Sequence, residues 1–157
     1  MRPELAPRIL VVDDDEAVRE SIGMVLRAAG YGVLTAVDGQ QALERVTENR
    51  IELLLLDLGL PVKSGWEVFE RIATEQSTIP IIIMTGQPNQ QFAALAAGAS
   101  VLMEKPLDVV SLLRCIRELL AEPVEKRLSR LRGHGRDFRR VPPASWFTKG
   151  DSAAGAG

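Results

Sequence analysis

The stretch "LLLLDLGLPVKSG", residues 53–65, runs four leucines into a carboxylate, Asp57, before a turn rich in Gly and Pro. A short, continuous apolar run bounded by turn residues is typical of a strand buried on both faces of a parallel sheet. Asp57 then has two interpretations. It is a turn former, since Asp, Gly and Pro cluster in turns, or it is a reactive group held at the end of a buried strand.

The rest of the chain favours an α/β fold. Five short apolar runs occur, at residues 8–12, 32–36, 53–57, 81–85 and 101–103. Between them, apolar residues recur at helical spacing, weakly in the Ala-rich stretch 91–98 and strongly in 107–120. Strands that alternate with helices imply right-handed βαβ crossovers. The sequence therefore predicts a doubly wound (βα)5 domain with a five-stranded parallel sheet.

Polar residues stand at the ends of four predicted strands. They are Asp13, Asp14 and Asp15; Asp57; Thr85; and Glu104 and Lys105. In doubly wound sheets, reactive residues gather beyond the carboxyl ends of the strands. Clustered carboxylates without His or Cys suit Mg²⁺, which also relieves their mutual repulsion. A lysine and a hydroxyl facing the same point complete a site for a phosphoryl group, and a carboxylate can become an aspartyl-phosphate.

Each residue also has a simpler interpretation. The aspartates at 13–15 could cap the first helix, because Asp is a favoured N-cap. Thr85, followed by Gly86, could be an ordinary strand exit, and Lys105 an exposed lysine. Turn chemistry, however, does not predict that all of them coincide at four different strand ends. Their coincidence favours a phosphorylation site.

Four segments carry a family resemblance. They are "ILVVDDDEAVRESI", "LLLLDLGLPVKSGWEVFERI", "IPIIIMTG" and "LMEKPLD". In this order they resemble the receiver domain of two-component response regulators, over residues 7–121. The resemblance implies a flavodoxin-like sheet with strand order 2-1-3-4-5. It also implies a phosphoryl donor, either a histidine kinase or a histidine phosphotransfer protein.

The same resemblance implies a role for each site residue. Asp57 is the phosphoacceptor, Thr85 hydrogen-bonds the phosphoryl group, and Lys105 pairs with it. The resemblance also implies a metal site for Mg²⁺, with Mn²⁺ as an alternative: Asp14, Asp57 and the backbone carbonyl of Gly59 bind directly, and Asp13 binds through water. The Lys105–Pro106 bond is expected to be cis.

Three positions depart from the family pattern. Leu102 stands where relatives usually carry Tyr or Phe, so the usual aromatic switch is absent. Thr85 and Lys105 are separated by 20 positions, about two fewer than usual, which predicts a short or shifted fourth helix. Gly59 and Gln87 line the expected path of the attacking water in relatives, and they leave the phosphoryl lifetime open.

Composition divides the chain into two parts. Residues 1–121 hold 17 acidic against 11 basic side chains, whereas residues 122–157 hold 4 against 8. We expect a receiver domain at 1–121 and a basic tail at 122–157, partly helical after Pro123 and then without regular structure. The run "RGHGRDFRR" is interpreted as solvated rather than as a nucleic-acid site.

No apolar run reaches the roughly 18 residues of a membrane helix. The N-terminus lacks the apolar region of a secretory signal, and a single cysteine fits a reducing compartment, so a cytoplasmic location is expected.

The sequence thus predicts a phosphorylation-dependent switch or phosphorelay carrier, monomeric or a phosphorylation-dependent homodimer. The resemblance implies that its unknown downstream protein would bind the face of the fourth helix, fifth strand and fifth helix. The chain is expected to catalyse only its own phosphorylation and dephosphorylation. The alternative is a short form or fragment of a DNA-binding regulator. A haloacid-dehalogenase-like phosphohydrolase is rejected, because that class needs an Asp where Gly59 stands.

Overall fold

The structure is a computed structural model that describes residues 6–60, 64–75, 78–86, 101–123, 125–126, 128 and 139–144. The strands are β1 (Arg8–Val12), β2 (Gly32–Ala36), β3 (Leu53–Asp57), β4 (Ile81–Thr85), β5 (Val101–Glu104) and β6 (Arg139–Val141). The helices are α1 (Glu16–Ala28), α2 (Gly39–Glu48), α3 (Gly65–Glu75) and α5 (Val109–Ala121).

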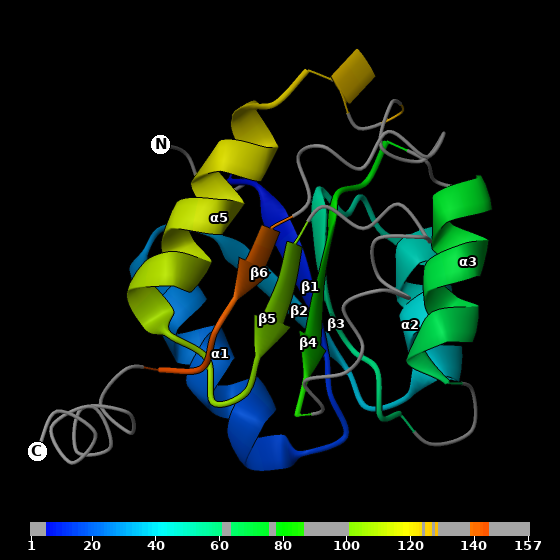
Figure 1. The fold of residues 1–157 in the computed structure, drawn as a ribbon. Helices are drawn as coiled ribbons and strands as arrows, with labels where there is room; N and C mark the ends of the chain where they lie inside the picture. Colours follow the sequence, from blue (N-terminus) through cyan, green and yellow to red (C-terminus); the bar gives the residue numbers. More distant parts are fainter. Residues whose placement is uncertain are drawn as a thin grey trace, which may run out of the picture.

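The strands form one parallel sheet in the order β2-β1-β3-β4-β5-β6. Helices α1 and α5 cover one face, and α2 and α3 cover the other (Figure 1). The predicted doubly wound fold and the strand order 2-1-3-4-5 are confirmed. Among the described helices, none has both the length and the apolar content that crossing a membrane requires.

The leucine run of β3 explains why the fold has two apolar cores. All five residues of β3 are buried, and so are all five of β4. Successive side chains of a strand point to opposite faces of the sheet. Leu54 and Leu56 therefore join the core beside α2 and α3, while Leu53 and Leu55 join the core beside α1 and α5. Burial on both faces is the reason that the run is continuous rather than alternating.

Aspartates at the starts of the helices behave differently from one another. The side chain of Asp15 caps α1 by accepting the backbone N–H of Ala17 at 2.9 Å. Asp38 caps α2 by accepting the N–H of Gln41 at 2.8 Å. Asp108 precedes α5 but accepts from the Ser111 hydroxyl, at 2.6 Å, instead of from the backbone. Of the three aspartates at 13–15, Asp15 is thus the structural cap.

A sixth strand corrects the predicted five-stranded sheet. Residues 139–141 of the tail pair in parallel with β5, where the sequence analysis expects a solvated basic run. Three residues with two arginines give neither a periodic nor an apolar signal, so pattern analysis does not find the strand. Backbone pairing with the edge of β5, rather than a local sequence pattern, holds residues 139–141 in a strand.

Several predictions lie outside the described residues. They concern the Ala-rich helix at 91–98, the shortened fourth helix, Gln87 and much of the tail. Of the helix expected after Pro123, the described residues Glu125, Lys126 and Leu128 are helical. Within the described part, Leu102 is fully buried in the core beside α2 and α3. The Lys105–Pro106 peptide bond is cis, as the resemblance implies.

Gly65 allows α3 to begin directly against the turn that follows β3. Its backbone N–H donates to the carbonyl oxygen of Leu58 at 3.2 Å. A Cβ atom at this position would lie 2.5 Å from the Cα of Leu58 and 2.6 Å from the carbonyl oxygen of Asp57. Both neighbours are backbone atoms, which cannot move aside without disturbing the turn.

We therefore expect Gly65→Ala to lower the free energy of unfolding by about 1–3 kcal/mol, the usual effect of overpacking. Urea unfolding followed by circular dichroism measures it. Gly86→Ala is the matched control, because a Cβ there has no neighbour within 4 Å; its effect should stay within about 0.5 kcal/mol. Equal effects of the two substitutions would contradict the proposed close approach.

Candidate functional site

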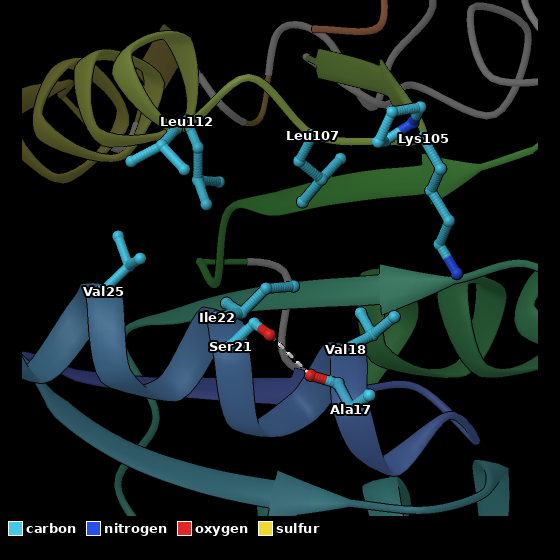
Figure 2. Close-up of a pocket in the computed structure, with 10 residues that line it drawn as sticks. Ala17, Val18, Ser21, Ile22, Val25, Lys105, Leu107 and Leu112 are labelled. Carbon is cyan, nitrogen blue, oxygen red and sulfur yellow. Dashed lines mark hydrogen bonds between the residues drawn. The ribbon is translucent and has the colours of Figure 1, made fainter.

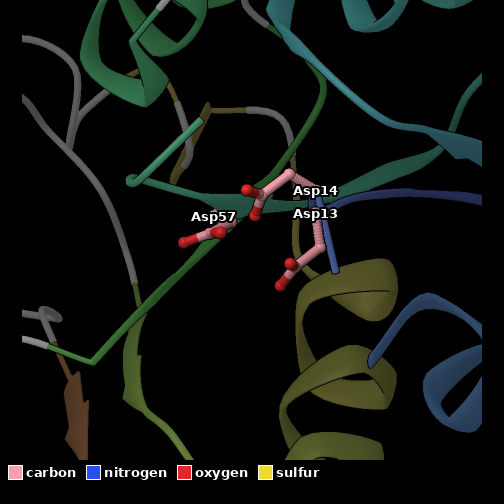
Figure 3. Close-up of side chains that lie close together, drawn as sticks. All are labelled: Asp13, Asp14 and Asp57. Carbon is pink, nitrogen blue, oxygen red and sulfur yellow. The ribbon is translucent and has the colours of Figure 1, made fainter. Parts of the chain in front are cut away.

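Three carboxylates meet at the carboxyl edge of the sheet. Asp13 and Asp14 follow β1, and Asp57 ends the neighbouring β3, where Val12 and Leu56 are register partners. One oxygen from each carboxylate lies within 4.8 Å of the others (Figure 3). Asp13 is fully buried and Asp57 is 6% exposed, whereas Asp14 faces solvent. The sheet thus holds like charges together at a partly open site.

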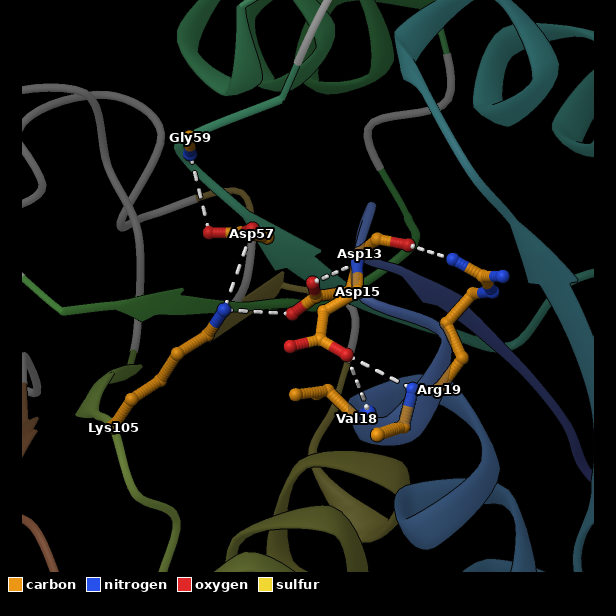
Figure 4. Close-up of polar contacts among 8 residues, drawn as sticks. Asp13, Asp15, Val18, Arg19, Asp57, Gly59 and Lys105 are labelled. Atoms are coloured by element: carbon orange, nitrogen blue, oxygen red, sulfur yellow. Dashed lines mark hydrogen bonds and ion pairs between the residues drawn. The ribbon is translucent and has the colours of Figure 1, made fainter.

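Lys105 brings a positive charge to this cluster from the end of β5. Its Nζ atom lies 2.7 Å from Oδ2 of Asp13 and 3.3 Å from Oδ2 of Asp57 (Figure 4). Burial by itself lowers the pKa of Lys105. The hydrogen bond to Asp13 and the charges of both aspartates outweigh burial, so the pKa is raised above its usual value. Lys105 therefore stays an ammonium group at the site.

The pKa of Asp57 is set by opposing effects of burial, hydrogen bonding and nearby charges. Burial raises its pKa, the hydrogen bond from the Gly59 N–H lowers it, nearby Asp13 raises it, and Lys105 lowers it. The net effect is a pKa above the ordinary aspartate value. The Gly59 N–H donates to Oδ1 at 3.1 Å, which leaves Oδ2 facing Lys105. Each oxygen of this carboxylate thus has its own partner.

The structure also places Thr85 at this edge. Thr85 ends β4 and is buried, and its carbonyl oxygen accepts the backbone N–H of Lys105 at 2.8 Å. Asp13, Asp14, Asp57, Thr85 and Lys105 therefore all lie at the carboxyl ends of four neighbouring strands, β1, β3, β4 and β5. The sequence analysis predicted this convergence from the parallel topology.

Two contacts that position Asp13 were not predicted. The backbone N–H of Asp15 donates to its Oδ1 at 2.9 Å, and Nη1 of Arg19 donates to its backbone carbonyl at 2.7 Å (Figure 4). These contacts hold the turn between β1 and α1 in place. Arg19 stands six positions after Asp13, a separation that carries no recognised motif, so the sequence offered no signal for it.

An apolar groove of about 480 Å³ opens beside Lys105. On one side α1 contributes Val18, Ile22 and Val25. On the other side lie Leu107, from the segment after β5, and Leu112, from α5 (Figure 2). The rest of the lining is Ala17, Ser21, Lys105, Pro106 and Val109. The groove is thus mostly apolar, with Lys105 as the charged residue of its lining.

The donor set of the cluster fits a hard divalent cation. Carboxylate oxygens are the ligands that Mg²⁺ and Ca²⁺ prefer, and Mg²⁺ commonly takes only one or two carboxylates and keeps several waters. Asp14 faces solvent and Asp57 is slightly exposed, whereas Asp13 is fully buried, so Asp14 and Asp57 offer the two more accessible carboxylates. The cluster can therefore bind a metal while the ammonium group remains beside it.

The chain is similar in sequence to proteins of one known family. The family model for the response regulator receiver domain matches residues 9–117. The transcriptional regulatory protein PrrA of Mycobacterium tuberculosis is 36% identical over 117 residues, which cover 73% of this chain and 50% of PrrA. The response regulator MprA of Mycobacterium leprae is 41% identical over 115 residues, covering 72% and 50%. The chain thus spans about half the length of these relatives.

Solved structures of response regulators are also similar to this chain. A CheY-like receiver domain protein of Methanospirillum hungatei aligns with a TM-score of 0.71 and 32% identity, covering 77% of this chain and 98% of that one. The response regulator TrrA of Thermotoga maritima, solved in complex with Mg²⁺ and a beryllium fluoride, aligns with a TM-score of 0.68 and 29% identity, covering 72% and 98%.

The raised pKa of Asp57 has a measurable consequence for stability. The folded chain binds this proton more tightly than the unfolded chain, so stability falls as pH rises above the unfolded pKa and through the folded one. In metal-free buffer we expect Asp57→Asn to raise Tm by a few degrees at about pH 7, with a smaller gain at about pH 4, where the wild-type carboxyl is partly protonated. Thermal unfolding at both pH values measures this.

Asp38→Asn is the matched control for this charge change. Asn caps a helix as well as Asp does. The Asp38 side chain accepts the backbone N–H of Gln41 in α2 and is not one of the three clustered carboxylates. Its Tm should change little at either pH. A wild type more stable than Asp57→Asn at neutral pH would show that Lys105 outweighs the burial of this carboxylate.

Proposed function

Because the chain belongs to the response regulator receiver-domain family, we propose that Asp57 is the residue that accepts a phosphoryl group. Receiver domains of two-component systems act as phosphorylation-dependent switches, and they take the group from histidine kinases. One observation supports Asp57 above all: it is a buried carboxylate at a strand end, with an ammonium nitrogen 3.3 Å away and two further carboxylates beside it.

In the proposed reaction, one oxygen of the ionised Asp57 carboxylate attacks the phosphorus of the donor. An O–P bond forms, the bond from phosphorus to the donor atom breaks, and the donor keeps that electron pair. Lys105 offsets the negative charge on the phosphoryl oxygens, and the Thr85 hydroxyl donates a hydrogen bond to one of them. Oδ2 of Asp57 already faces Lys105, which favours this oxygen as the nucleophile.

Mg²⁺ is the proposed metal of the carboxylate cluster, with Mn²⁺ as an alternative. Asp14, Asp57 and the backbone carbonyl of Gly59 would bind it directly, and Asp13 through water. When bound, it neutralises charge on the carboxylates and on the phosphoryl oxygens. The fit of the donor set supports this assignment, and so does the Mg²⁺ in the Thermotoga maritima relative.

Metal binding should appear as thermal stabilisation. A ligand that binds only the folded state stabilises it by about 2.7 kcal/mol at a hundred times its Kd. We expect Mg²⁺ to raise the Tm of the wild type by several degrees, and to raise that of Asp14→Asn much less. Asp38→Asn, with the same charge change, should respond like the wild type. Equal responses of all three proteins would place the metal elsewhere.

Receiver domains are signalling domains rather than enzymes that turn over a separate substrate. We propose that this chain catalyses its own phosphorylation and dephosphorylation, with Asp57, Thr85 and Lys105 as the catalytic residues.

A cytoplasmic location is part of the proposal, supported by a single cysteine, Cys115, which is buried and unpaired. The domain division at residue 121 also belongs here, because α5 ends at Ala121.

Phosphorylation can be tested without knowing the donor protein. After incubation with Mg²⁺ and acetyl phosphate, intact-protein mass spectrometry should show one added phosphoryl group on the wild type. Asp57→Ala should show none, and omission of Mg²⁺ should abolish it in the wild type. Asp38→Asn should be labelled normally.

Absence of labelling has two causes that a second probe separates. Beryllofluoride mimics a phosphoryl group but is not hydrolysed. If it stabilises the wild type but not Asp57→Ala, then the adduct forms and decays too quickly to be trapped. If it binds neither protein, the proposed phosphorylation of Asp57 is wrong.

The apolar groove supports a protein donor. It lies between α1 and the start of α5, next to Lys105. A histidine kinase or histidine phosphotransfer protein that packs an apolar helix there would bring its phosphohistidine to the cluster. We propose this groove as the donor surface. The downstream partner remains assigned to the face of the fourth helix, β5 and α5.

A second function is favoured by the length of the relatives. PrrA is named a transcriptional regulatory protein, and this chain matches about half of it. The alternative is therefore that the chain is a short form or a fragment of a DNA-binding regulator. Electrophoretic mobility shifts at two salt concentrations test this, because binding through phosphate contacts weakens steeply with salt.

A further inference from the structure

The outer edge of β5 is filled by a segment from the C-terminal tail. On its inner side β5 pairs with β4, so without β6 it would be an edge strand of the sheet. An edge strand presents unpaired N–H and C=O groups and is a ready template for another strand. Here residues 139–144 occupy that template (Figure 1).

The backbone and one apolar side chain fix how this segment sits. Arg139, Arg140 and Val141 are the register partners of Val101, Leu102 and Met103. Past the strand, the Ala144 N–H donates to the carbonyl of Pro106 at 2.9 Å. The Val141 side chain is buried in the core that β5 and α5 share. Because Pro142 and Pro143 carry no N–H, they end the pairing after three residues.

Arg140 makes the contact between residues 139–144 and β5 selective for an arginine, because it pairs with a carboxylate. Its Nε and Nη2 atoms donate to Oε1 of Glu104 at 3.1 and 2.6 Å, and the Glu104 side chain is buried. Charge-assisted hydrogen bonds to a buried carboxylate are the stronger kind. Arg139 instead pairs at 2.6 Å with Glu118 of α5, and both of these side chains are exposed, a situation in which ion pairs contribute little.

We propose that the outer edge of β5, residues 101–106, is a strand-addition surface that recognises an extended segment with an arginine opposite Leu102 and a β-branched residue after it. The chain's own residues 139–144 occupy it as a removable cover. A partner strand must displace this cover before it pairs with β5. The cover contacts Glu104 and Pro106, the residues on either side of Lys105. The proposal stands independently of the phosphorylation of Asp57.

Hydrogen–deuterium exchange of the full chain tests the cover. In the wild type, the amides of residues 101–104, of 139–141 and of Ala144 should be protected. Arg140→Glu places two carboxylates together and should speed exchange in both segments about tenfold or more. Arg139→Glu makes the same charge change in the same strand, and we expect a much smaller effect. The double variant Glu104→Arg with Arg140→Glu should restore protection.

Unprotected amides at residues 139–141 in the wild type, or equal effects of the two arginine substitutions, would overturn the proposal. Protection of β1 and β3 amides in the same experiment reports whether each variant is folded.

Addition of a strand in trans tests recognition. A capped peptide of residues 139–144 is titrated into isotope-labelled chain, and amide shifts of Leu102 and Met103 are followed by NMR. We expect the peptide to bind Arg140→Glu chain about tenfold more tightly than wild type, because the cover is loosened there. The same peptide with Glu in place of its second arginine should bind neither. Equal binding of the two peptides would rule out recognition through Glu104.

Discussion

Repulsion among three carboxylates is the constraint on which the site depends, and Lys105 is the group that relieves it. Asp13 and Asp57 are buried at the ends of adjacent strands, and the Lys105 ammonium contacts both. A buried ionic cluster is weak support for stability, since apolar residues of similar size would often do as well. Its presence at a strand-end edge, with a raised pKa at Asp57, instead fits a binding or reactive role.

The parallel sheet made most of this arrangement predictable from the sequence. The continuous leucine run of β3 indicates a strand buried on both faces, and the structure buries every residue of it. Once five strands are parallel, their carboxyl ends meet at one edge. The aspartates, Thr85 and Lys105 must then lie together there, however far apart they are in the chain. Helical periodicity and the Asp15 cap follow from equally local rules.

Other features depend on contacts between distant residues, and no local pattern encodes those. Arg19 secures the turn that carries Asp13 through a single hydrogen bond to a carbonyl oxygen. Glu104 precedes Lys105 and looks like a further member of the acidic cluster, yet its side chain pairs with Arg140, 36 positions later. The same contact between Glu104 and Arg140 joins β6 to β5. Leu102 could pack inward or outward by sequence alone, and the structure buries it.

The connection between α5 and β6 sets a concentration threshold for any competitor of the tail strand. The residues between Ala121 and Arg139 tether the strand to the surface that it covers. Because the strand belongs to the same chain as the surface, its pairing with β5 is intramolecular and acts as a high effective concentration. A free segment with the same contacts would therefore lose to the tethered one at ordinary cellular abundance. Only a partner that adds contacts beyond the β5 edge, or that is itself tethered nearby, would gain lasting access.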